Sequence, residues 1–157
     1  MSDSITVNGL EVRGPVPAHH TLLTWLRNHA FYEVKEGCGE GVCGACTVLL
    51  NGRTVASCTL LALKAEGGHV TTSRGLLGDD GTLHSLQDAF WAAGAAQCGF
   101  CTQGMLMAAY ELLVTNPRPS TDEIREALHG NLCRCTGYQA IVDAVRAASL
   151  ESGGSKG

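Results

Sequence analysis

Cysteine is the residue of this sequence best suited to chemistry, and the chain contains eight. The start, MSDSITVNGL, lacks the basic and apolar regions of a secretory signal peptide, so we expect a cytoplasmic protein. Clustered thiols in a reducing compartment are typical of metal binding or catalysis rather than of disulfides. They form two groups: a first group of Cys38, Cys43, Cys46 and Cys58, and a second group of Cys98, Cys101, Cys133 and Cys135.

The first group has the spacing C-x4-C-x2-C, followed after an interval by Cys58. This spacing is typical of the plant-type [2Fe–2S] cluster. Glycines between the thiols would let the backbone adopt positive φ angles and approach a cluster closely. Successive N–H groups would then point inward and bind an anion. A zinc site is the alternative, because zinc also takes four thiolates. The glycines concerned are Gly37, Gly39, Gly41 and Gly44.

The second group combines a C-x2-C pair with a C-x-C pair, and each pair adjoins the start of a predicted helix. Helix N-termini carry partial positive charge and unpaired N–H groups, which suit an anionic cluster. The spacing alone does not decide between an iron–sulfur cluster and zinc.

The first half of the chain reads as a small mixed sheet with one or two helices. Two segments of alternating residues each contain an Asn-Gly pair, which is the signature of a tight hairpin. The hairpins are predicted around Asn8-Gly9 and Asn51-Gly52, a helix at residues 22–30, a strand at 69–72 and a linker at 75–81.

The second half reads as four helices. Capping boxes, in which two side chains satisfy the first N–H groups of a helix, are predicted at Ser120–Glu123 and at Thr136–Gln139. Phe90 and Trp91 are predicted to lie in the core. We expect the tail, about residues 150–157, to be disordered because it is rich in glycine and serine.

Composition limits the classes of partner. The 11 basic residues are scattered among 15 acidic ones, whereas a nucleic-acid groove needs clustered Lys and Arg. No apolar run reaches the roughly 18 residues of a membrane span. We therefore expect neither nucleic acid nor membrane as a partner, while export alongside a partner that carries the signal stays open.

Three motifs together resemble the small iron–sulfur subunit of the molybdenum hydroxylases, the xanthine oxidase family. They read EGCGEGVCGACTVLLNG, AAQCGFCTQGM and GNLCRCTGY, and the resemblance spans roughly residues 4 to 149. It implies an α+β protein, with a β-grasp domain like plant ferredoxin at residues 1–78 and an all-α four-helix domain at 79–157. One departure is Gln103, where the family often has proline.

The resemblance also implies roles for individual residues. The first group matches the ligands of an outer [2Fe–2S] cluster, and the second group those of an inner one. Gln97 and Cys135 match positions that touch the molybdenum pterin of a partner subunit. No catalytic residue is expected on this chain, because the family's substrate site is on another one.

The implied function is electron transfer within an oxidoreductase that hydroxylates or dehydrogenates its substrate. Electrons would pass from the molybdenum pterin of a large subunit through both clusters to FAD on a medium subunit. The three chains would form a heterotrimer, and two heterotrimers a dimer. The alternatives are a free-standing two-cluster ferredoxin that serves another reductase, and a structural zinc protein.

Overall fold

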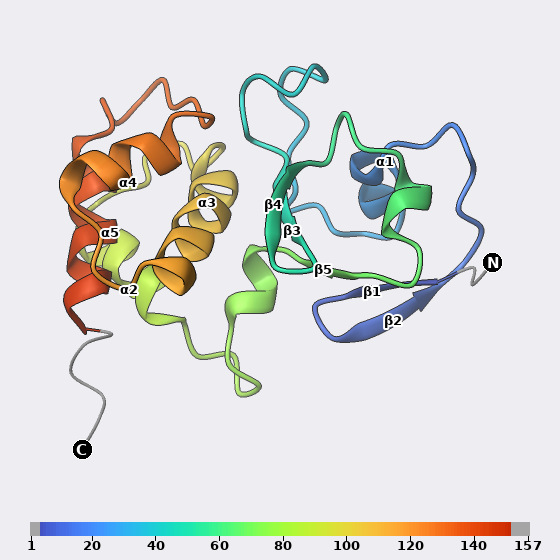
Figure 1. The fold of residues 1–157 in the computed structure, drawn as a ribbon, viewed down its shortest axis with the longest axis horizontal. Coiled ribbons are helices and arrows are strands. Elements are labelled where there is room, and N and C mark those ends of the chain that lie inside the picture. Colours follow the sequence, from blue (N-terminus) through green and yellow to red (C-terminus); the bar gives the residue numbers. More distant parts are fainter. Residues whose placement is uncertain (1–3, 152–157) are drawn as a thin grey trace.

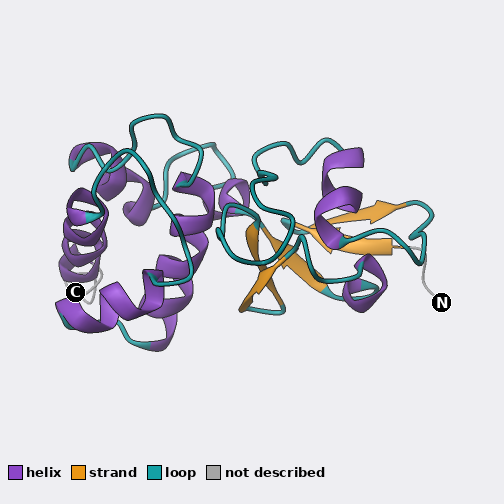
Figure 2. Cartoon of the chain, turned by 90° about the horizontal axis from the view of Figure 1, so that it is seen from above, coloured by secondary structure: helices purple, strands orange, loops and turns teal. Residues whose placement is uncertain are grey.

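A computed structural model describes residues 4–151. The strands lie together on one side of the molecule and the helices of the second half on the other (Figures 1 and 2). The strands are β1 (Ser4–Val7), β2 (Leu10–Arg13), β3 (Thr47–Leu50), β4 (Arg53–Ala56) and β5 (His69–Thr71). The α-helices are α1 (Leu22–Asn28), α2 (Ser85–Ala92), α3 (Thr102–Thr115), α4 (Thr121–Leu128) and α5 (Gln139–Glu151), with short 3-10 helices at Ala62–Ala65 and Ser73–Leu76.

Both predicted hairpins are present. β1 pairs with β2, and β3 with β4, each in antiparallel register across a two-residue turn. Asn8 and Gly9 have φ angles of 52° and 81°, and Asn51 and Gly52 have 51° and 82°. Positive φ at both turn positions matches the right-handed twist of the strands, which is why Asn-Gly was a reliable signal.

The five strands form one mixed sheet in the order β2-β1-β5-β3-β4. β5 is central, pairing parallel with β1 and antiparallel with β3. Side chains alternate between the two faces of a strand. In β3, Val48 packs in the core with α1, while Leu49 belongs to the core of the helical half. The sheet is therefore covered on both faces, and the predicted α+β class is confirmed.

Within the described residues, four helices follow the sheet, as predicted, and α3 lies nearest to it (Figure 1). α2 packs against α5, with Phe90 buried. The prediction for Trp91 is wrong, since its side chain is 85% exposed. Neighbouring positions on a helix do not face the same way, so burying Phe90 directs Trp91 toward solvent.

One predicted capping box is confirmed and the other is wrong. At Ser120–Glu123 both reciprocal hydrogen bonds of the box are present. α5 instead begins at Gln139 itself, whose amide bonds to Asp143 at 2.9 Å. Because Gln139 is the first helical residue, its side chain does not reach back to a cap. A further capping box, formed by His84 and Gln87 at the start of α2, was not predicted from the sequence.

Glu111 of α3 fastens the helical half to the outer strand of the sheet. Its carboxylate accepts the Thr54 N–H at 3.1 Å and lies 2.8 Å from Nε of Arg53. β4 is an edge strand, and an edge carries N–H groups that need acceptors. The carboxylate supplies one.

No helix within residues 4–151 is long and apolar enough to cross a membrane. Disorder was predicted from about residue 150 onward, but Leu150 and Glu151 are helical and belong to α5. Its remaining residues, 152–157, lie outside the described part of the chain.

Candidate metal centres

The hairpin β3–β4 brings two thiols of the first group together. Cys46 directly precedes β3 and Cys58 follows β4, and the register pairs Thr47 with Ala56. Both cysteines are buried, with 2% and 7% of their surface exposed. The prediction that a returning hairpin places Cys58 beside Cys46 is confirmed.

The loop before β3 directs its backbone N–H groups at the sulfurs. Sγ of Cys38 accepts N–H groups from Glu40 at 3.3 Å, Val42 at 3.3 Å and Cys43 at 3.4 Å. These donors stabilise the thiolate, and the backbone N–H groups of Cys43, Glu40 and Val42 lower the pKa of Cys38 to about 6.

Cys58 is in the opposite environment. Burial, and next the neighbouring thiol of Cys46, raise the pKa of Cys58 to about 11. Its sulfur accepts one backbone N–H, from Gly41 at 3.2 Å. Gly41 has a φ of 76°, a conformation that glycine adopts without steric cost.

Gly37 is needed for a different reason, because a Cβ there would lie 2.7 Å from the Cys43 sulfur.

The second group comes from two segments far apart in the sequence. Cys101 is the N-cap of α3, and Cys133 and Cys135 lie in the loop before α5. The sulfurs of Cys98 and Cys135 are 3.5 Å apart, and both residues are exposed.

Cys101 and Cys133 form a second, more buried pair. Burial, followed by the Cys133 thiol, raises the pKa of Cys101 to about 12. Burial also acts to raise the pKa of Cys133, but hydrogen bonds led by the Thr136 hydroxyl, 3.1 Å from the sulfur, bring it down to about 7.

The thiols of each group therefore gather in two pairs. Contacts join Cys38 to Cys43, Cys46 to Cys58, Cys98 to Cys135, and Cys101 to Cys133, and charge interactions across the pairs also link Cys38 to Cys58 and Cys98 to Cys101. Within residues 4–151, no three Cys, His, Asp or Glu side chains surround one point as ligands of a single ion do. Two ligand pairs suit the two irons of a [2Fe–2S] cluster.

A direct hydrogen bond joins the two groups. The N–H of Leu132, next to Cys133, donates to the carbonyl oxygen of Cys43 at 2.9 Å. The side chain of Asn131 reinforces the contact by donating to the carbonyl oxygen of Gly44 at 3.0 Å. A methyl group at Gly104 of α3 would overlap that carbonyl, so glycine permits the close approach.

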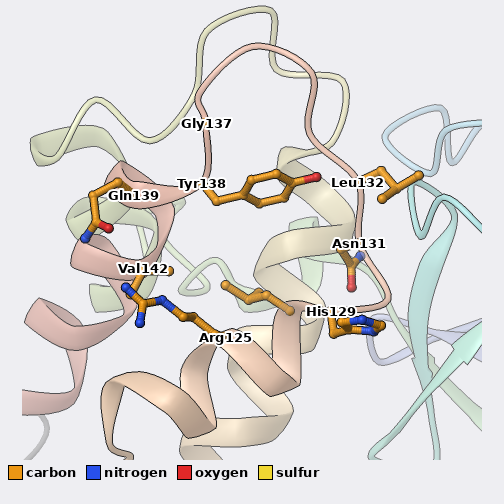
Figure 3. Close-up of a pocket in the computed structure, with 9 residues that line it drawn as sticks. Arg125, His129, Asn131, Leu132, Gly137, Tyr138, Gln139 and Val142 are labelled. Carbon is orange, nitrogen blue, oxygen red and sulfur yellow. The ribbon is translucent and has the colours of Figure 1, made fainter.

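Beside the second group lies a pocket of about 560 Å³, open to solvent between α4 and α5. Figure 3 shows the ring of Tyr138 reaching across it toward Leu132. The Tyr138 hydroxyl accepts the N–H of Cys133 at 3.0 Å. Tyr138 has a φ of 69°, which is uncommon for a bulky residue. The sequence reading missed its contact with Cys133, because the motif itself does not reveal the direction of the ring.

The two residues predicted to meet a pterin share one surface. Gln97 is exposed and immediately precedes Cys98, whose sulfur contacts that of Cys135. Gln97 and Cys135, together with Cys98, are therefore exposed on the side where the second group reaches solvent.

Comparisons with known proteins agree with this geometry. Residues 5–72 match the family described as a 2Fe-2S iron-sulfur cluster binding domain, and residues 72–146 match the [2Fe-2S] binding domain family. The chain thus carries two [2Fe–2S]-binding domains.

Individual relatives cover nearly the whole chain. The nicotine 6-hydroxylase small subunit of Paenarthrobacter nicotinovorans is 49% identical over 98% of this chain and 92% of its own length. The xanthine dehydrogenase iron-sulfur-binding subunit of Escherichia coli O157:H7 is 44% identical over 89% of each chain.

A solved structure, quinoline 2-oxidoreductase from Pseudomonas putida 86, superimposes with a TM-score of 0.91 at 44% identity, covering 97% of this chain and 95% of that one. The sheet is thus the predicted ferredoxin-like domain, and the helical half is the second binding domain. The chain belongs to the iron–sulfur subunits of the molybdenum hydroxylases, the xanthine oxidase family.

Proposed function

We propose that this chain relays single electrons from a molybdenum pterin on a large subunit to FAD on a medium subunit. The first group of cysteines would hold an outer [2Fe–2S] cluster and the second group an inner one. The three chains would assemble as a heterotrimer and pair as a dimer. The names of the relatives, a small subunit and an iron-sulfur-binding subunit, support larger partners.

The hydrogen bond between Leu132 and Cys43 is the observation that carries the proposal. It spans 2.9 Å and connects a residue adjacent to Cys133 with Cys43 itself. Each cluster, when bound, accepts and releases one electron at a time. The protein's part is to hold the two thiol groups close and rigid, and this bond does so directly.

Exposure supports an entry and an exit for electrons. Cys98 and Cys135 are exposed, and Cys38 is partly exposed, whereas Cys46 and Cys58 are buried. Each group therefore has a solvent-facing side that a partner could approach. Phe100 and Leu132 are large apolar residues exposed beside the second group. Their burial against another subunit would be favourable.

Metal and sulfide analysis of the anaerobically purified chain tests the proposal, together with electron paramagnetic resonance after reduction. Two irons and two sulfides for each group, with two distinct [2Fe–2S] signals, are expected. One zinc for each group and no signal would contradict it. Flavin and molybdenum chains should also co-purify from cells that express the whole complex, while a free-standing ferredoxin would purify alone.

A further inference from the structure

Gln103 connects the two cysteine groups through its side chain. It lies in the first turn of α3, two residues after Cys101, and is 6% exposed. Its Nε2 donates to the carbonyl oxygen of Thr47 at 2.6 Å and to that of Ala45 at 3.3 Å. These two carbonyls flank Cys46. One amide from the helical half therefore holds both sides of a first-group cysteine.

Burying the Gln103 amide costs stability, so side-chain packing alone does not explain why glutamine stands at this position. Within the described residues, Oε1 of Gln103 is buried and has no hydrogen-bond partner. A buried oxygen without a donor is destabilising, and a methionine of similar length would fill the space without it. Methionine would, however, lack the N–H groups that Gln103 donates to the carbonyl oxygens of Thr47 and Ala45.

We propose that Gln103 is a positioning residue for electron transfer between the two groups. It fixes the separation between the loop that carries Cys46 and the helix that carries Cys101. Its amide N–H groups also offset the carbonyl dipoles around Cys46, which makes the reduction potential at the first group more positive. The inference rests on the proposed function, which supplies the two clusters.

Gln103→Met removes both donors and keeps the length of the side chain. In the reduced, cluster-loaded chain, we expect a smaller magnetic splitting between the two iron–sulfur signals, because the loop moves away from α3. The potential at the first group should become more negative, and the potential at the second group should not move.

Gln87→Met is the matched control. Nε2 of Gln87 donates to the carbonyl oxygen of Ser73 at 3.0 Å, outside both cysteine groups. It also loses the hydrogen bond that the His84 N–H donates to Oε1 of Gln87 in the capping box of α2. Like Gln103→Met, this variant therefore loses two hydrogen bonds and should be less stable, with its splitting and both potentials unchanged. Gln103→Pro serves if the methionine variant does not fold, because the first turn of a helix tolerates proline.

Splitting and potentials equal to wild type in Gln103→Met, with full iron content, would overturn the inference and leave the proposed function standing. Absence of iron from the wild-type chain would instead contradict the proposed function. In that case, hydrogen exchange of the Leu132 N–H in the metal-free chain tests whether Gln103 positions the two cysteine groups. Gln103→Met loses both hydrogen bonds that Nε2 donates, which predicts at least about tenfold faster exchange, and an unchanged rate would refute the positioning role.

Discussion

At the scale of single residues, backbone N–H groups make the first group's thiols unequal. Cys38 accepts three of them and is accessible, while Cys58 accepts one and is buried. Donors stabilise negative charge on sulfur and burial opposes it. The loop therefore stabilises negative charge more strongly at the partly exposed Cys38 than at the buried Cys58.

Cys43→Ser should remove the metal of the first group and leave that of the second. Serine replaces a soft thiolate with a harder oxygen and is a poorer ligand for iron. Iron content should fall by about half, with one resonance signal lost. In the assembled complex, substrate should still reduce the second group, but flavin reduction should stop. Flavin reduction at the wild-type rate would show that the relay order is wrong.

Gly41→Ala should be more harmful than Gly52→Ala, although both glycines have left-handed φ angles of 76° and 82°. An alanine held in the left-handed backbone conformation lowers the stability of the fold by about 1–2 kcal/mol at either position. At Gly41 the new Cβ also lies 3.2 Å from Cγ2 of Thr59, whereas at Gly52 nothing lies within 4 Å. Chemical denaturation measures both losses, and only Gly41→Ala should also weaken iron retention. Equal effects on iron would contradict the role of the Gly41 N–H.

At the scale of elements, α3 is the helix that unites the molecule. Its first turn carries Gln103 and Gly104 against the first-group loop, and its third turn carries Glu111 against β4. The capping box at α4 and the Asn-Gly hairpins were predictable, because each depends on residues only a few positions apart. The role of α3 was not, because its partners in the first-group loop and in β4 lie more than 50 residues away: Glu111 and Thr54 are separated by 57 positions.

Glu111→Gln should loosen β4 from α3. The amide retains one oxygen but lacks the charge that strengthens hydrogen bonds from Thr54 and the contact with Arg53. We expect the free energy of unfolding to fall by about 1–2 kcal/mol, with faster hydrogen exchange at the Thr54 N–H. Glu126→Gln, at an exposed position of α4, is the control and should change neither. No effect of Glu111→Gln on Thr54 exchange would show that the edge is held by other contacts.

At the scale of the whole molecule, residues 4–151 form two hydrophobic cores, with Cys46 and Cys58 in the sheet core and Cys101 in the helical core. Leu49 of β3 belongs to the helical core and Val48 to the sheet core, so a single strand serves both. The cores come from periodic apolar residues.

Removing the metal should lower thermal stability without erasing secondary structure. Metal binding that occurs only in the folded state contributes directly to folding free energy. Anaerobic chelation is expected to lower Tm and to speed hydrogen exchange first in residues 37–46 and 131–138, while far-ultraviolet circular dichroism stays nearly constant. A metal-free chain with unchanged Tm would mean that neither site contributes to stability.

The sequence by itself determined the number and spacing of the thiols, the Asn-Gly turns, the Ser120–Glu123 cap and the family. Each is a local pattern or a motif whose meaning does not depend on distant residues. Only the tertiary structure decided that Cys98 pairs with Cys135, that Leu132 bonds to Cys43, that Gln103 spans both groups, and that Trp91 faces solvent. These features depend on how segments remote in sequence meet, and their geometry is set by the packing of α3 against β3 and its preceding loop.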